Sequence, residues 1–284
     1  MIPANTMDLI LSELDKVHEQ SALRPATGPL PDRNAIVAIV RDVQALLFPG
    51  YYAGSEKSGA QALLASISFR LEAQLDAVYR FLGISAEHID GLVCRFLAEL
   101  PRIKEMLCKD VEALYEGDPA ARCREEVLLC YPGFNAIAIY RIAHVLYQLE
   151  VPILPRIMTE YAHAQTGIDI HAGATIGEYF FIDHGTGIVI GETTVIGNHV
   201  KLYQGVTLGA KSFELDEDGN PVKGIKRHPN IGDHVIIYAN ATILGGRTTV
   251  GDGCVIGGNT WLVHSVPPGQ TVYYTNKSET APIE

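Results

Sequence analysis

A six-residue repeat governs the second half of this chain. Between Ile168 and Leu208 an aliphatic residue returns at every sixth position, apart from one longer step. A period of six matches neither the 3.6 residues of an α-helix turn nor the alternation of a simple strand. It is typical of short strands that are joined by tight corners and stacked as coils, which is a parallel β-helix of hexapeptide repeats. The repeated positions are Ile170, Ile176, Ile182, Ile190, Ile196, Leu202 and Leu208.

The repeat has two irregular steps besides one long interruption. It resumes after the interruption at Ile231, Ile237, Ile243, Val250, Ile256 and Leu262. The step from Ile243 to Val250 is seven residues long and predicts a bulged corner. The step from Ile182 to Ile190 is eight residues, and its extra residues fall within 183–187, which read Asp-His-Gly-Thr-Gly. Local rules tend to fail where function overrides them, so this break predicts a functional site.

The first half of the chain is predicted to be helical. Asp118 followed by Pro119 is expected to begin one helix, with Asp118 as its N-cap. We therefore expect an α+β fold, with an α-helical domain at 1–165 and a left-handed parallel β-helix domain at 166–284. Apolar residues at helical spacing mark the other segments, at 7–17, 33–48, 60–82, 86–100, 102–115, 134–149 and 154–165.

The long interruption of the repeat is a polar segment at 211–226. Its tip, at 218–221, reads Asp-Gly-Asn-Pro and predicts a hairpin-like excursion from one corner. The segment ends at Arg227-His228-Pro229, immediately before the repeat restarts. A long loop on a rigid scaffold often supplies groups that contact a substrate, although a plain solvated insertion has the same composition.

Composition excludes several classes of protein. The formal net charge of −11 argues against a nucleic-acid surface. The chain has no run of 18 apolar residues and no signal-like start, so we expect a cytoplasmic protein that does not bind membranes. The cysteines are an odd number, five, without a CxxC pair, which favours free thiols over disulfides or a zinc site. We expect them to be packing residues.

Several motifs together resemble one enzyme family, the serine O-acetyltransferases, which make O-acetylserine from serine and acetyl-CoA. The resemblance spans roughly residues 100–270. Its most specific part is the combination of two motifs, Asp-His-x-Thr-Gly and Arg-His-Pro. The hexapeptide repeats alone occur in many acyltransferases. The matching segments are GDPAA, YPGFNAIAIYRIAH, DIHAGATIG, IDHGTGIVIGET, QGVTLG and RHPNIG.

The resemblance implies a catalytic pair. His184 occupies the place of the general base that takes the proton from the serine hydroxyl, a task that suits an imidazole at neutral pH. Asp169 matches the carboxylate that orients this base and stabilises the imidazolium. Acetyl transfer would be direct, since no Ser or Cys stands beside His184 in the sequence as an evident nucleophile.

The resemblance also implies a pocket for an amino acid. Asp118 and Asp183 match acidic residues that surround the substrate, whose ammonium group needs such anions. Arg227 and His228 match the groups that face its carboxylate, where a guanidinium can bind with two hydrogen bonds.

Acetyl-CoA is implied as the co-substrate, in a groove between neighbouring subunits, and no metal is expected. Ala210 stands where the family has a second glycine, and the C-terminal segment departs from the family pattern, which leaves adenine recognition open. Candidate contacts with CoA, by position, are Gly209, Lys211, Ala239, Gly257 and Gly258.

The resemblance further implies a homotrimer, joined through its N-terminal helices into a dimer of trimers. The apolar faces at 33–48 and 60–82 are expected to pack between trimers. Many members end in isoleucine and bind a sulfhydrylase, but this chain ends in Glu284, so that partnership is not expected.

Three alternatives compete with this interpretation. Another hexapeptide acyltransferase could act on a different amino acid or on a sugar. A β-helical zinc carbonic anhydrase needs three suitably placed histidines, and only His228 and His234 are well spaced. A non-catalytic solenoid would not need the Asp-His motif. The remaining histidines are interpreted as surface or corner residues: His163, His171, His199, His234 and His264.

Overall fold

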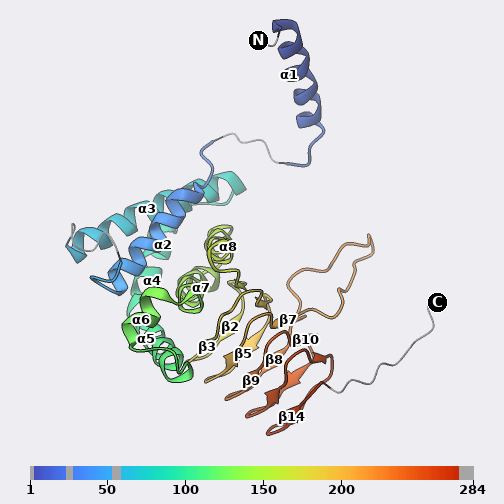
Figure 1. Ribbon diagram of the computed structural model, residues 1–284. Helices are drawn as coiled ribbons and strands as arrows, with labels where there is room; N and C mark the ends of the chain where they lie inside the picture. The colour runs from blue at the N-terminus through green and yellow to red at the C-terminus, as the bar shows by residue number, and fades with distance from the viewer. Residues whose placement is uncertain (1–2, 24–27, 53–58, 275–284) are drawn as a thin grey trace.

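A helical part is followed by a column of short strands (Figure 1). The structure, a computed structural model, describes residues 3–23, 28–52 and 59–274. Its helices are α1 (Ala4–Glu19), α2 (Arg33–Leu47), α3 (Ala60–Leu82), α4 (Ile89–Ala98), α5 (Leu100–Gly117), α6 (Arg124–Cys130), α7 (Pro132–Gln148) and α8 (Leu154–Thr166). None of the described helices is long and apolar enough to cross a membrane.

The predicted helices are confirmed with small shifts at their ends, but the prediction at Asp118 is wrong. Asp118 follows the last residue of α5, and the next helix begins at Arg124. The physical reason is a local turn: the Asp118 Oδ1 accepts the N–H of Ala120, 2.8 Å away, two residues along the chain. Asp118 is therefore a turn residue after a helix rather than an N-cap before one.

The apolar faces of α2 and α3 are buried within the chain. α2 packs against α3, α7 and α8, so its face is covered without a second subunit. The expectation that these faces need a neighbouring trimer is wrong, because helices of the same chain already cover them. The buried residues are Ile36, Ile39, Val40, Val43 and Leu47 on α2, and Leu63, Ile67, Leu71, Leu75 and Val78 on α3.

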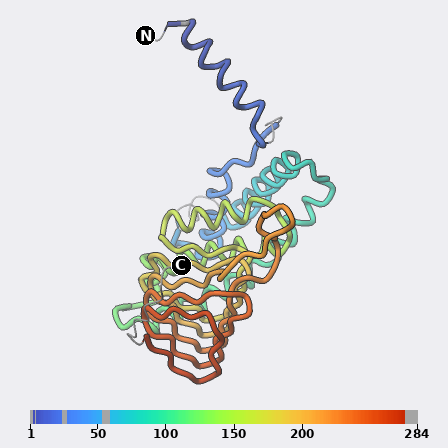
Figure 2. The backbone as a smooth tube through the Cα atoms, turned by 90° about the vertical axis from the view of Figure 1, so that its right-hand side faces the viewer, coloured from blue at the N-terminus to red at the C-terminus, as the bar shows by residue number. Residues whose placement is uncertain are grey.

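α1 is the helix that remains uncovered. Figures 1 and 2 show it projecting from the body of the molecule at the N-terminal end. Its apolar residues are exposed, and Met7, Ile10, Leu14 and Val17 recur at the alternating three- and four-residue spacing of a helix-pairing stripe. Most of the stability of a helix in a protein comes from tertiary packing of its apolar face, and within the described chain α1 lacks such packing.

A buried ion pair connects the helices with the column. Arg141 on α7 donates to both carboxylate oxygens of Asp110 on α5, at 2.6 and 2.8 Å. The same guanidinium donates to the carbonyl oxygens of Ile176 and Gly177, at 3.3 and 2.8 Å. Asp110 also accepts the N–H of Phe180 at 3.0 Å. The pair therefore holds two helices and the first coil together, with nearly all its polar atoms satisfied by protein partners.

The column has three faces, and each face is a sheet of parallel strands. This arrangement confirms the β-helix predicted from the repeat. Face A has the order β1-β4-β7-β10-β13, face B the order β2-β5-β8-β11, and face C the order β3-β6-β9-β12-β14. The strands are β1 (Asp169–Ile170), β2 (Thr175–Ile176), β3 (Phe181–Ile182), β4 (Val189–Ile190), β5 (Val195–Ile196), β6 (Lys201–Leu202), β7 (Thr207–Gly209), β8 (Asn230–Ile231), β9 (Ile236–Ile237), β10 (Thr242–Leu244), β11 (Thr249–Val250), β12 (Val255–Ile256), β13 (Trp261–Leu262) and β14 (Thr271–Val272).

The repeat positions fill the inside of the column. Equivalent residues pair in register, as Ile170 does with Ile190 and Ile190 with Leu208 on face A. All of these aliphatic side chains are buried except Leu262, which lies on the last strand of face A. One aliphatic residue per strand thus sets both the register and the core.

The irregular steps of the repeat appear where they were expected. The seven-residue step lengthens β10 by one residue and places Gly245 at a φ of +104°, which favours glycine. The excursion at 211–226 forms a hairpin: Leu215 and Pro221 form an antiparallel bridge, and the N–H of Val222 donates to the Glu214 carbonyl, 2.8 Å away. This hairpin leaves the corner between faces A and B.

Candidate active site

The eight-residue step forms a corner between faces C and A that projects His184 outward. The φ angles of His184, Gly185 and Gly187 are +54°, +84° and +80°, so the chain turns sharply here. A side chain at Gly185 would collide with Ile168, which explains the glycine. The His184 side chain is 72% exposed and thus accessible to a substrate.

Two carboxylates gather at this corner. The Asp183 Oδ1 lies 3.6 Å from the His184 Nε2. Asp118 arrives from the end of α5, and its Oδ2 accepts the hydroxyl of Tyr131 at 2.5 Å. That bond, the Ala120 N–H and then the charge of His184 hold the pKa of Asp118 below its usual value. Asp118 is therefore ionised at neutral pH and can attract an ammonium group.

Asp169 lies on the strand next to this corner. Its N–H donates to the Ile188 carbonyl at 2.9 Å, and the Gly187 N–H donates to the Gly167 carbonyl at 2.8 Å, so β1 is tied to the corner. The His184 ring lies within ion-pair distance of the Asp183 carboxylate but not of the Asp169 carboxylate. Among the described residues, the Asp169 carboxylate lies instead within 4.8 Å of Glu160 and His163. The implied Asp169–His184 hydrogen bond is absent from this conformation of the described chain.

A second group of polar residues occupies the corner between faces A and B. The Arg227 guanidinium donates to Glu192 Oε2 at 2.5 Å, and the Tyr147 hydroxyl donates to Oε1 at 3.0 Å. Burial raises the pKa of Glu192, but these two hydrogen bonds outweigh it and leave the pKa below its usual value. Glu192 and Tyr147 were missed by sequence reasoning, although Glu192 lies inside a motif that carried the resemblance.

Thr193 fixes the turn that carries Arg227 and His228. Its hydroxyl oxygen accepts the N–H groups of both residues, at 3.0 and 3.1 Å. The Thr193 backbone N–H donates to His228 Nδ1 at 3.1 Å, and the hydroxyl lies 2.9 Å from the same nitrogen. Since a backbone N–H can only donate, Nδ1 is an acceptor and the proton of the ring is on Nε2. His228 is thus oriented as a neutral hydrogen-bond donor.

We expect His228 to stay neutral well below pH 6. Burial, followed by the charge of Arg227, lowers its pKa to about 4. The unfolded chain therefore binds more protons than the folded chain between pH 6.5 and pH 4, and this contribution to stability is lost as the pH falls through that window. Nitrogen-15 NMR of histidine-labelled protein should show the Nε2–H form at pH 6, with exposed His264 as the control. Titration of His228 near pH 6.5 would contradict this assignment.

The two groups are separated by the width of face A. The His184 corner precedes each strand of face A, whereas the Arg227 corner follows it. The candidate CoA contacts divide in the same way: Ala239, Gly257 and Gly258 lie at the corner of His184, and Gly209 and Lys211 lie on the side of Arg227. A single chain therefore does not bring all of the predicted site residues into one pocket.

The cavities agree with this division. One of about 940 Å³ lies under the hairpin and is lined by Glu192, Arg227 and the hairpin residues. Another, of about 410 Å³, is lined by Lys211 and Gly245 among others. Both cavities are on the Arg227 side of face A, next to the excursion that was predicted to contact a substrate.

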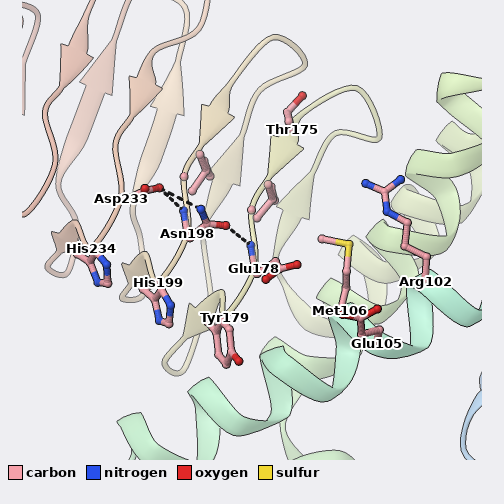
Figure 3. Close-up of a pocket in the computed structure, with 14 residues that line it drawn as sticks. Arg102, Glu105, Met106, Thr175, Glu178, Tyr179, Asn198, His199, Asp233 and His234 are labelled. Atoms are coloured by element: carbon pink, nitrogen blue, oxygen red, sulfur yellow. Dashed lines mark hydrogen bonds between the residues drawn. The ribbon is translucent and has the colours of Figure 1, made fainter.

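A further cavity of about 900 Å³ lies at the corner between faces B and C (Figure 3). The rings of Tyr179, His199 and His234 stack there with centroid spacings of 4.4 and 4.7 Å. None of the predicted site residues lines this cavity. His199 and His234 are corner residues, as expected, and this cavity is not the one that the motifs indicate.

The cysteines are free, as predicted, but most do not pack inside the protein. Cys254 is buried, whereas Cys94, Cys108, Cys123 and Cys130 are exposed. The expectation of packing residues is therefore wrong for these four. They lie on or beside the exposed faces of helices α4, α5 and α6, away from the buried stripes.

Comparison with known proteins gives consistent matches. Residues 55–138 match the family model for the N-terminal region of serine acetyltransferase. The chain is 47% identical over 261 residues to a plasmid serine acetyltransferase of Synechococcus elongatus, covering 86% of this chain and 82% of that protein. It is 47% identical over 167 residues to the serine acetyltransferase of Bacillus subtilis, covering 59% and 72%.

Solved structures agree with the sequence matches. Serine acetyltransferase 1 of Entamoeba histolytica in complex with L-cysteine superposes with a TM-score of 0.75 at 39% identity, covering 83% of this chain and 86% of that one. Serine acetyltransferase of Neisseria gonorrhoeae in complex with serine gives a TM-score of 0.59 at 29% identity, covering 88% and 95%.

Proposed function

Because this chain belongs to the serine acetyltransferase family, we propose that it transfers the acetyl group of acetyl-CoA to the hydroxyl of L-serine by direct attack. The family confirms the resemblance carried by the motifs, the acyltransferase class and the left-handed β-helix. The products would be O-acetylserine and CoA, in a step that supplies cysteine biosynthesis.

His184 is the proposed general base. It would take the proton of the serine hydroxyl as the oxygen attacks the acetyl carbonyl, and then return a proton to the departing CoA sulfur. The observation that carries this assignment is the gathering of Asp118 and Asp183 around an exposed imidazole. Two carboxylates beside a base suit a substrate whose ammonium group lies near its nucleophilic hydroxyl. Asp169 would orient the base once its side chain turns from Glu160 and His163 toward His184.

Arg227 and His228 would bind the substrate carboxylate from a neighbouring subunit. They lie at the opposite edge of face A from His184, so two chains are needed to complete one pocket. A ring of subunits that meets head to tail creates such a contact, and three-fold symmetry closes it. This arrangement supports the proposed homotrimer and a CoA groove that both edges line.

An assay of acetyl-CoA consumption tests the proposal. Purified protein should turn over L-serine, with much less activity toward homoserine, threonine and aminosugars. Turnover of an aminosugar alone would overturn the proposed function and favour another hexapeptide acyltransferase.

Replacing Arg227 with alanine should lower the apparent affinity for serine by about tenfold to a hundredfold, because a hydrogen bond to a charged group contributes roughly 1.5–3 kcal/mol. The KM for acetyl-CoA should change much less. Arg227→Lys is the matched control, since it keeps the charge but loses the planar fork and should give an intermediate defect. If the unaltered enzyme used serine methyl ester as well as serine, carboxylate recognition by Arg227 would be wrong.

Removing residues 1–31 should separate two levels of assembly. This cut removes α1 but keeps α2, whose apolar face is buried against α7 and α8. If α1 joins two trimers, the truncated chain should be a fully active trimer, while the full chain is a hexamer. Light scattering measures both masses. An unchanged assembly after truncation would contradict the role of α1, and an active full-length monomer would contradict the shared pocket.

The tail after residue 274 lies outside the described residues, so the expected absence of a sulfhydrylase partner stays a prediction.

A further inference from the structure

Three side chains with metal-ligand chemistry meet where α8 passes into β1. Glu160 and His163 lie three residues apart on the last turns of α8, and Asp169 begins β1. One ligand atom of each lies within 4.8 Å of the other two. The His163 Nδ1 is 3.5 Å from the Glu160 Oε2. A tetrahedral zinc with ligands at about 2.1 Å needs ligand atoms roughly 3.4 Å apart, so small side-chain rotations would complete such a set.

The backbone that carries these three residues is well fixed. The Thr166 hydroxyl donates to the Ala162 carbonyl at 2.7 Å and accepts the N–H of Ile168 at 3.1 Å. Gly167, at a φ of +70°, donates its N–H to the His163 carbonyl at 2.8 Å. The three ligand side chains therefore stand on one rigid junction of only ten residues, 160–169. Rigid supports of this kind favour a defined coordination geometry.

The local charge also favours a cation. The group lies at the C-terminal end of α8, where the helix dipole is negative. Arg156 pairs with the Glu160 Oε1, which leaves Oε2 on the side of His163. In the described part of the chain, no residue donates a hydrogen bond to the Asp169 carboxylate or forms an ion pair with it. Arg156 thus pairs with only one of the two carboxylates, and the Asp169 carboxylate keeps an oxygen available as a ligand.

We propose that Glu160, His163 and Asp169 form a site for a divalent cation of the zinc class. One imidazole nitrogen and two carboxylate oxygens are a ligand set for zinc, cobalt or nickel, whereas magnesium takes oxygen ligands only. Solvent would complete the coordination, because Glu160 and His163 are both partly exposed. The sequence had indicated no metal, since His163 alone in a helix carries no such signal.

The site has a consequence for catalysis, which rests on the proposed function. Asp169 is also the carboxylate assigned to orient His184. A metal held through Asp169 would occupy that carboxylate, so zinc should lower turnover without entering the substrate pocket. Glu160 and His163 take no part in the proposed chemistry, so their replacement should leave the metal-free activity unchanged.

Cobalt binding tests the site without reference to activity. Full-length protein titrated with Co²⁺ should bind one ion per chain, with visible absorption bands of nitrogen and oxygen ligation. His163→Ala and Glu160→Gln should each lower affinity by at least about tenfold, since even outer-shell changes at metal sites cost this much. His184→Ala should retain binding. Equal binding by His163→Ala and the unaltered chain would overturn the proposal, as would intense near-ultraviolet bands of thiolate ligation.

Zinc inhibition tests the link to catalysis separately. Zinc should inhibit the unaltered enzyme, and His163→Ala should resist that inhibition while keeping its metal-free turnover. His264→Ala, a change of an exposed histidine far along the column, should remain as sensitive as the unaltered enzyme. Inhibition of equal strength in His163→Ala would contradict the link, and the cobalt titration would still decide the site even if the chain failed to acetylate serine.

Discussion

Replacing His184 with alanine should lower the turnover of serine by about 10²–10⁴-fold, the usual range for the loss of a positioned general base. The side chain is exposed and packs against little, so the fold and the assembly should be retained. Steady-state kinetics with saturating acetyl-CoA gives the turnover, and light scattering gives the mass of the assembly. Near-normal turnover in folded protein would remove His184 from the proposed mechanism.

His199 provides a matched control for that substitution. It has the same φ of +54° and is also exposed at a corner of the column, but it lies between faces B and C. His199→Ala thus reproduces any backbone effect of removing a left-handed histidine, and it should leave turnover unchanged. Asp169→Asn should reduce turnover less than His184→Ala, because the base remains while its orientation is weakened.

Replacing Arg141 with methionine should destabilise the fold by about 3–5 kcal/mol, because it leaves the buried Asp110 carboxylate without its cation. Both side chains are almost wholly inaccessible to solvent. Chemical denaturation at a fixed protein concentration measures the effect. Arg80→Met is the control, since its ion pair with Asp76 is exposed and contributes at most about 1 kcal/mol.

The defect of Arg141→Met should shrink as the pH falls. Burial raises the pKa of Asp110, and Arg141 opposes that rise. Without Arg141 the folded chain binds a proton at Asp110 more tightly than the unfolded chain does, so stability falls as pH rises through the acidic range. A defect that grows on acidification would contradict this account. Asp110→Leu combined with Arg141→Met should recover much of the lost stability, because no unpaired charge remains buried.

The repeat predicted most of the column because one aliphatic residue per strand determines burial, register and coil length together. The seven-residue step marked the bulge near Gly245, and the eight-residue step marked the corner of His184.

The turn at Asp118 was mistaken for a helix start, because an Asp-Pro pair has the same appearance in a helix cap and in a local Asx turn.

The sequence indicated which residues to consider for the candidate site but not how they are divided in space. The family resemblance assigns His184 and Arg227 to one pocket, yet only the stacking of coils shows that they occupy opposite edges of face A. Glu192 and Thr193 were missed because their importance depends on contacts with a turn about 35 residues away, which no local pattern reports. The burial of α2 likewise depends on helices α7 and α8, which follow much later in the chain.

The placement of Arg227 and His184 on opposite edges of one face has a kinetic consequence. If each pocket is shared as proposed, a newly synthesised chain is inert until it meets two others, and the onset of activity depends steeply on how fast chains accumulate. Dilution would then lower the specific activity before any chain unfolds. The activity per chain would therefore rise with the concentration of the enzyme, and at low concentration little acetyl-CoA would be consumed.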